Sequence, residues 1–200
     1  MKNSIVFIFV IVGIFILFQS YTTLSINNSD SQMYRVIRMD TNFEIRFYLP
    51  TAVATFTSSE KNFDALNSVG VSKLQNYINR GNNEKQIIPM TTPIHFDIND
   101  SVSSVSFVMP LTFNASNLPK PIDAQVSVKN IPDEHVAVIQ FGGFATEKDI
   151  SIYTEKLKAI LKANAIPFYG NFRFLCYNPS YQLIDRKNEI IVDVQLPSEK

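Results

Sequence analysis

The pattern of apolar and polar positions predicts the same unit twice along the chain. Residues 43–49 alternate between apolar and polar side chains, as in a strand with one buried face, and residues 52–57 form a second apolar strand. Helical spacing of apolar residues follows from about Glu60 to Asn79, after Ser58 or Ser59, either of which can cap a helix. Two more strands are expected near 94–98 and 102–109. The first half therefore reads strand–strand–helix–strand–strand.

The second half repeats this order. Strands are expected near residues 125–131 and 135–141, followed by a helix that Thr146 caps, and then by strands near 172–177 and 188–196. We predict an α+β fold in which the two units meet as one pseudo-symmetric domain, with its helices packed on a sheet or barrel.

The N-terminal segment is apolar and differs from the rest. Lys2 precedes an uncharged run from Ile5 to Phe18, which is shorter than the ~20 residues of a membrane-spanning helix and typical of a signal-peptide core. We expect residues 1–25 to be a cleaved signal peptide or, if residues 5–24 are retained, a membrane anchor. The protein is then exported (periplasmic or secreted) or membrane-anchored. Residues 26–40 are expected to be a polar linker that turns into the first strand, which leaves 41–198 as the domain.

Composition excludes several classes of protein. The formal net charge is zero, which gives no electrostatic reason to expect nucleic-acid binding. Cys176 is the single cysteine, so an intrachain disulfide and covalent haem attachment through a CxxCH motif are both excluded. It lies in an apolar run and is expected to be a small buried side chain rather than a ligand.

Candidate chemistry is sparse. The two histidines, His95 and His135, belong to predicted strands and lack metal-ligand spacing, so structural roles are favoured. The sequence has no nucleophile elbow, no phosphate-binding glycine loop and no paired carboxylates that indicate acid–base catalysis. We therefore predict no catalytic residue and no metal site, and we expect the protein not to be an enzyme.

The segment from Arg80 to Phe96 is apolar but cannot be a regular central strand. Pro89 and Pro93 interrupt it, and proline donates no backbone hydrogen bond. Gly81 and Asn82 fit the end of the preceding helix because both tolerate positive φ. Such a segment is held either for packing or for a ligand, and packing is the more common reason.

Five short motifs, in this order and at this spacing, resemble the SOUL haem-binding protein family. They are Gly81-Asn82, Met90-Thr91-Thr92-Pro93-Ile94, Phe141-Gly142-Gly143-Phe144-Ala145, Tyr177-Asn178-Pro179 and Arg186-Lys187-Asn188-Glu189-Ile190. The resemblance covers about Phe43 to Leu196. It implies a twisted, mostly antiparallel eight-stranded barrel with two long helices.

The resemblance also implies a ligand. Family members bind haem or another tetrapyrrole non-covalently in a shallow apolar groove beside the first helix and the loop before the last strand. Carried onto this chain, the groove draws on residues of the helix and of the loop: Val71, Leu74, Gln75, Ile78, Tyr181, Leu183 and Ile184. The candidate cations for the propionates are Lys73, Arg80, Arg186 and Lys187. Alternatively, Leu74 and Ile78 belong to the ordinary core and the basic residues to a solvated rim.

One residue departs from the family pattern. Some members carry a histidine, a proposed iron ligand, in the first strand between an arginine and a tyrosine, but here the triplet is Arg46-Phe47-Tyr48. Two other functions stay open: a structural or protein-interaction domain of the same fold without haem, and a small-molecule effector-binding barrel. The repeated unit also resembles effector domains of bacterial regulators, which often carry a central carboxylate. Glu134 and Glu189 are the only candidates for it.

Overall fold

The structure is a computed structural model that describes residues 2–27, 31–59, 61–99 and 102–196. These residues form three helices and one nine-stranded antiparallel sheet, so the predicted α+β class is confirmed. The helices are α1 (Lys2–Asn27), α2 (Phe63–Ile78) and α3 (Glu147–Ala163). The strands are β1 (Tyr34–Met39), β2 (Glu44–Tyr48), β3 (Thr51–Ser58), β4 (Ile94–Asp97), β5 (Ser103–Val108), β6 (Val126–Ile131), β7 (Glu134–Gly142), β8 (Phe168–Cys176) and β9 (Lys187–Val194).

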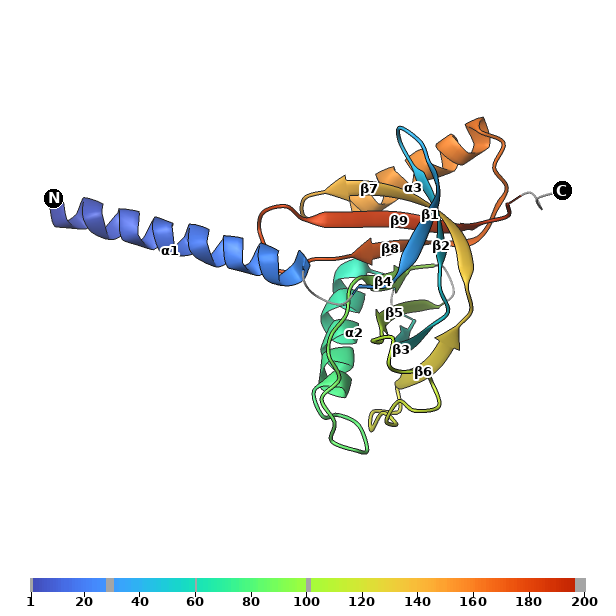
Figure 1. The fold of residues 1–200 in the computed structure, drawn as a ribbon, viewed down its shortest axis with the longest axis horizontal. Coiled ribbons are helices and arrows are strands. Elements are labelled where there is room, and N and C mark those ends of the chain that lie inside the picture. Colours follow the sequence, from blue (N-terminus) through green and yellow to red (C-terminus); the bar gives the residue numbers. More distant parts are fainter. Residues whose placement is uncertain (1, 28–30, 60, 100–101, 197–200) are drawn as a thin grey trace.

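The two predicted units, β2–β3–α2–β4–β5 and β6–β7–α3–β8–β9, are interlocked. The strand order is β1-β2-β7-β9-β8-β4-β5-β3-β6, with β8 at the centre and the two units joined where β8 pairs with β4. Each unit contributes its first strand to the other, because β2 pairs with β7 and β6 pairs with β3. The sheet curls, and α2 packs on β3 and β5 while α3 packs on β7, β8 and β9 (Figure 1).

This exchange of strands predicts that neither half folds alone. Separately expressed residues 35–118 and 119–198 should be unfolded or aggregated, because each half exposes the edges that its partner strand covers. Far-UV circular dichroism and thermal melting of each half, beside the full chain, measure this. Two halves that each melt cooperatively would contradict the prediction.

The sheet has one strand more than the eight expected. β1 lies inside the segment 26–40 that we expected to be linker, and it pairs with β2 through a register that shifts between Val36 and Arg38. All six of its residues are exposed, and β1 is an edge strand of the sheet. It therefore lacks the alternation of buried and exposed positions that identifies the other strands.

Helix caps were predicted correctly at one helix and wrongly at the other. Thr146 caps α3 as expected: its Oγ1 accepts from Asp149 N at 3.2 Å, and Asp149 Oδ2 accepts from Thr146 N at 3.0 Å. At α2 the cap is Asn62, whose Oδ1 accepts from Ala65 N at 2.9 Å, rather than Ser58 or Ser59. Ser58 instead ends β3.

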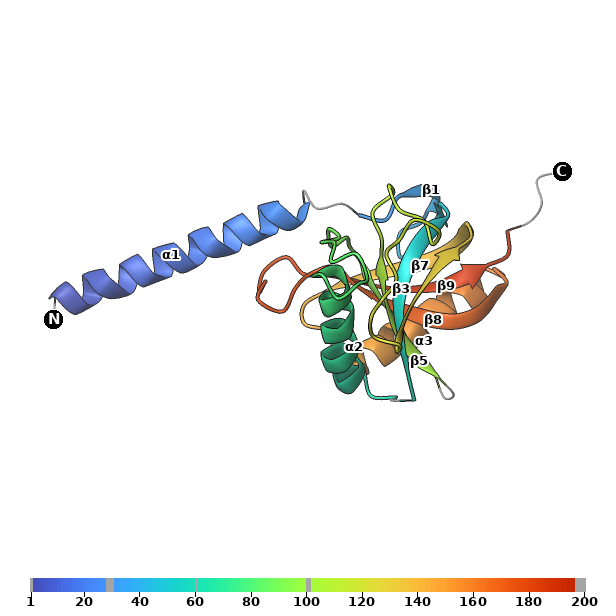
Figure 2. The same cartoon turned by 90° about the horizontal axis from the view of Figure 1, so that it is seen from below.

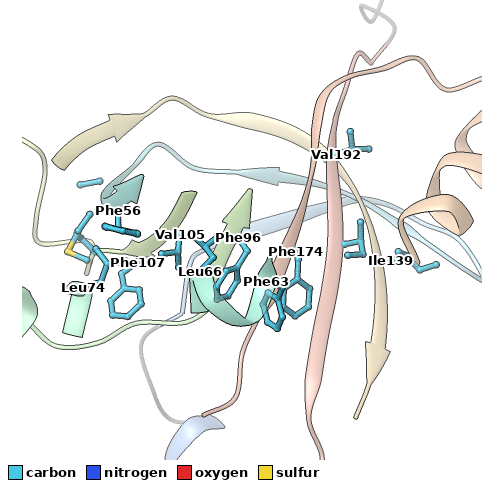
Figure 3. Packing of buried hydrophobic residues seen from close by; sticks show 14 of the residues in the cluster. Phe56, Phe63, Leu66, Leu74, Phe96, Val105, Phe107, Ile139, Phe174 and Val192 are labelled. Carbon is cyan, nitrogen blue, oxygen red and sulfur yellow. The ribbon is translucent and has the colours of Figure 1, made fainter. Parts of the chain in front are cut away.

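An aromatic cluster joins the two units at the centre of the sheet. The Phe63 ring from α2 meets the Phe96 ring of β4 at 5.1 Å and the Phe174 ring of β8 at 5.4 Å, both edge to face (Figure 3). All three side chains are buried. The core is thus continuous from one unit to the other.

Helix α1 extends away from the folded domain (Figures 1 and 2). Its described side chains from Val6 to Phe18 are apolar apart from Gly13, and almost all are exposed. Within the described residues, no helix has the combined length and hydropathy needed to cross a membrane.

Candidate functional site

A cavity of about 540 Å³ opens between α2, the centre of the sheet and the loop that joins β8 to β9. Most of its walls are apolar or aromatic, and the apolar lining residues are Phe63, Val71, Met90, Ile94, Phe96, Phe144, Ala145, Phe174, Tyr177, Pro179 and Tyr181. A separate cavity of about 440 Å³, lined by Leu49, Pro50 and Phe113 among others, contains three prolines and no residue of α2. The larger, aromatic cavity is therefore the better candidate for a flat apolar ligand.

Arg186 holds the β8–β9 loop in shape at the rim of this cavity. Its Nη1 donates to the carbonyls of Pro179 at 2.6 Å and Gln182 at 2.7 Å, and its Nη2 donates to that of Asn178 at 3.1 Å. The guanidinium also lies 4.2 Å from the centre of the Phe144 ring. Three of its N–H groups thus bind the loop while the guanidinium contacts the ring, so Arg186 organises the rim as well as lining it.

The structure separates the helix residues predicted for the groove into two groups. Val71 and Gln75 line the cavity. Leu74 and Ile78 are buried in the core, with 0% and 4% of their surface exposed, and do not line it. Arg80 is exposed beyond the end of α2, with φ of 73°. The alternative that assigned Leu74 and Ile78 to the ordinary core matches this arrangement.

The predicted loop residues likewise fall into those that line the cavity and those that do not, and two of the predicted cations are bound elsewhere in the protein. Tyr181 lines the cavity, whereas Leu183 and Ile184 are exposed and lie outside its lining. Lys73 pairs with Asp123 at 2.6 Å, and Lys187 pairs with Glu189 at 3.0 Å. The structure thus gives both lysines carboxylate partners within the protein.

Sequence reasoning identified only Val71 and Gln75 of the stripe of α2 that lines the cavity. Phe63, Asn67, Val71 and Gln75 recur every four residues and therefore lie on one side of the helix. Two of its four residues are polar, so the stripe is harder to recognise in the sequence than the more hydrophobic stripe that forms the core. The sequence indicates this stripe through the four-residue spacing of its members rather than through their hydrophobicity.

The irregular segment 80–96 serves both packing and the cavity. Ile88 is buried, and Met90 and Thr92 line the cavity. Positive φ falls on Arg80 rather than on Gly81, which corrects our expectation for this turn. Gly81 is needed for close approach, since a Cβ there would lie 2.5 Å from the carbonyl oxygen of Asn76.

Neither histidine lines the cavity. His95 lies on β4 between Ile94 and Phe96, which line it, and its Nε2 is 2.9 Å from Gln32 Oε1. Burial lowers the pKa of His95 to about 3, so the ring is neutral at physiological pH. The His135 ring packs on the Phe47 ring at 4.9 Å. Among the residues that the structure describes, no cluster of three or more His, Cys, Asp or Glu could hold a metal ion.

Two sulfur atoms belong to residues that line the cavity. Cys176 lies at the end of β8, and its Sγ is 3.4 Å from the carbonyl oxygen of Asn178. Burial raises the pKa of this thiol, so it is protonated rather than a ready thiolate ligand. Met90 also lines the cavity, and its thioether carries no charge.

A buried ion pair contacts Tyr177, one of the residues that line the cavity. Arg46 binds Glu189 through two parallel hydrogen bonds, Nη1 to Oε2 at 2.9 Å and Nη2 to Oε1 at 3.0 Å. The Arg46 side chain is 2% exposed and that of Glu189 is 0% exposed. Tyr177, which lines the cavity, donates its hydroxyl to Glu189 Oε2 at 2.7 Å. Burial alone would lower the pKa of Arg46, but the attraction of Glu189 outweighs it and raises that pKa.

The carboxylates considered for an effector-binding barrel are both paired with arginines. Glu189 binds Arg46 as described, and Glu134 binds Arg173 at 2.9 Å. Neither residue lines the cavity. The carboxylate among the described residues that line the cavity is instead Asp64, in the first turn of α2.

Comparison with known proteins identifies relatives over most of the chain. The family model described as "SOUL heme-binding protein" matches residues 29–193. The chain is similar to Heme-binding protein 1 of Xenopus laevis, with 27% identity over 156 residues, which cover 74% of this chain and 81% of that protein. It is also similar to human Heme-binding protein 2, with 25% identity over 158 residues, 74% of this chain and 76% of that protein.

Solved structures with the same fold are more distant in sequence. The C-terminal domain of EcmrR superposes with a TM-score of 0.60 at 10% identity, covering 82% of this chain and 98% of that one. A hydrolase from Listeria innocua superposes with a TM-score of 0.56 at 6% identity, covering 80% of this chain and 94% of that one. At these identities the likeness concerns the fold alone.

Proposed function

Because the chain belongs to the SOUL heme-binding protein family, we propose that it binds haem or another tetrapyrrole non-covalently, without catalysing a reaction. The ligand would lie in the cavity of about 540 Å³ between α2 and the β8–β9 loop. The observation that most supports this proposal is the aromatic lining of the cavity. A porphyrin ring has two large flat apolar faces, and moving them out of water is favourable.

Polar groups at the cavity suit the edge of a porphyrin. Asn67, Gln75 and Ser180 line it and can donate hydrogen bonds to propionate oxygens. Arg186 is the cation among the lining residues, and its Nε is buried without a hydrogen-bond partner among the described residues. A propionate near Arg186 would meet a positive charge that the loop already holds in place.

The iron would contribute little to the affinity. Haem, when bound, supplies a redox-active iron, whereas the residues of this chain bind and orient the ring. The two histidines lie outside the cavity lining, and Phe47 replaces the histidine of related triplets. Cys176 and Met90 are the soft donors at hand, and the Cys176 thiol is protonated. Burial of apolar surface should therefore dominate binding.

A Soret titration with three porphyrins tests this function. We expect haemin, zinc protoporphyrin and metal-free protoporphyrin to bind about equally well, because the metal adds little. The variants His95→Ala and His135→Ala should bind haemin like the wild type, and Met90→Leu and Cys176→Ser should leave the position of its Soret band unchanged. Far-UV circular dichroism verifies that each variant is folded, which matters most for the buried His95.

Two results would contradict parts of this function. A sharp loss of haemin affinity in any one of these variants, with zinc protoporphyrin unaffected, would show iron coordination. No spectral change with any porphyrin would favour a structural or protein-interaction domain of the same fold.

We also propose that residues 1–25 direct the protein out of the cytoplasm, because Lys2 and the apolar run that follows match an export signal or an anchor.

A further inference from the structure

Helix α1 is apolar in every direction around its axis. The apolar side chains from Val6 to Phe18 are each between 46% and 72% exposed. Successive residues of a helix point about 100° apart, so this uninterrupted run leaves no polar face. A protein partner would cover one face of such a helix, whereas lipid surrounds it on all sides.

The folded domain holds α1 at the residue where the apolar run ends. Gln19 is 3% exposed, its Nε2 donates to the carbonyl oxygen of Tyr181 at 3.1 Å, and its Oε1 accepts from Leu183 N at 3.0 Å. The Phe18 ring lies 6.4 Å from the Tyr181 ring. Both contacts fall on the β8–β9 loop. A cleavage near Ser25 would remove the partner of this loop, so the contacts favour retention of α1.

The tip of the same loop is apolar and exposed. Tyr181, Leu183 and Ile184 are 59%, 49% and 61% exposed. In both views the β8–β9 loop is the part of the domain that reaches furthest toward the N-terminal end of α1 (Figures 1 and 2). Tyrosine next to apolar side chains is characteristic of protein surfaces at a membrane–water interface.

We propose that α1 is retained and that the domain docks on a lipid surface through the tip of the β8–β9 loop. Leu183 and Ile184 enter the interfacial layer, Tyr181 lies at its boundary, and the apolar part of α1 inserts into the lipid without crossing the bilayer. Gln19 sets the height of the domain above the lipid by fixing α1 to the loop. Since Tyr181 also lines the cavity, the cavity opens beside the lipid. Docking itself does not require a tetrapyrrole.

Site-directed fluorescence on the full chain tests the docking. In a Cys176→Ser background, which removes the single native cysteine, Ile184→Cys carries an environment-sensitive nitrobenzoxadiazole label. Ile122→Cys is the matched control, because Ile122 is 58% exposed and its amide binds Gly81 at the far end of α2. Each labelled protein is reconstituted into phosphatidylcholine vesicles with and without lipids that carry a nitroxide near the head group.

The label at position 184 should shift its emission to the blue in vesicles and lose intensity to the nitroxide lipids, whereas the label at 122 should do neither. Adding Gln19→Ala should reduce the quenching at 184, because the loop is no longer tied to α1. The proposal is overturned by an unquenched label at 184, by equal quenching at both positions, or by quenching that Gln19→Ala leaves unchanged.

Two further results would also overturn it. A blue shift at 184 that appears without vesicles and grows with protein concentration would show that a second copy covers the tip. Mass spectrometry that finds the mature chain without residues 1–25 would show that α1 is removed. Neither result depends on whether the cavity binds a porphyrin.

Discussion

A Glu189→Ala variant should lose about 3–5 kcal/mol of its free energy of unfolding, because it leaves the Arg46 guanidinium buried without its main partner. Glu44 still accepts from Arg46 Nε at 2.7 Å, which favours the lower end of this range. The same change frees the Tyr177 hydroxyl from its carboxylate acceptor, so the wall of the cavity loses its support as well. Urea unfolding followed by circular dichroism measures the difference.

Two variants serve as controls for this experiment. Glu155→Ala removes a glutamate of an exposed pair with Lys158, whose side chains are 68% and 38% exposed, and should cost less than about 1 kcal/mol. The double variant Arg46→Met, Glu189→Leu should recover most of the stability, because it removes both charges together. Equal losses in Glu189→Ala and Glu155→Ala would show that the buried pair has no special role.

Placing a charge on the wall of the cavity should weaken porphyrin binding strongly. Val71→Asp brings a carboxylate to a half-buried lining position, where a bound ring would remove it from water. We expect a loss of about 2–4 kcal/mol of binding free energy, or roughly 30- to 1000-fold in Kd. The Soret titration described above measures this change. Ile78 is unsuitable for the same test because it is 4% exposed in the core, where aspartate would disrupt folding.

The matched control for this variant lies two residues away on the same helix. Val69 is 49% exposed and lies outside the cavity lining. Val69→Asp therefore introduces the same charge into α2 without touching the proposed site, and its porphyrin affinity should equal that of the wild type. If both aspartate variants weaken binding alike, the ligand does not occupy this cavity.

Local patterns were sufficient to predict the repeated unit, because each of its strands and helices buries one face against the core. They could not predict β1, whose residues are all exposed. They also could not predict that β2 and β6 are exchanged between units, since this pairing depends on the whole sheet. The partners Arg46 and Glu189 are 143 residues apart, and nothing in their immediate neighbours indicates that they meet.

The site was predicted less completely than the fold. Resemblance to a family pointed to α2 and to the β8–β9 loop, both of which border the cavity, but it also included Leu74 and Ile78, which pack into the core. The lining stripe includes Asn67 and Gln75, which look like surface residues in the sequence. A residue that faces a ligand cavity resembles neither a core nor a surface position, so its periodicity is more informative than its polarity.

The position of β9 inside the sheet, rather than at an edge, affects the order in which the protein can fold during its synthesis. Among the described strands β9 is the last to be made, yet it lies between β7 and β8 and carries the partner of Arg46. At about 5–20 residues per second, the ribosome adds the 143 residues from Arg46 to Glu189 in roughly 7–29 s. Throughout this time Arg46 lacks its bidentate partner and the core stays open. The nascent chain is therefore exposed to chaperones and proteases until β9 has been synthesised.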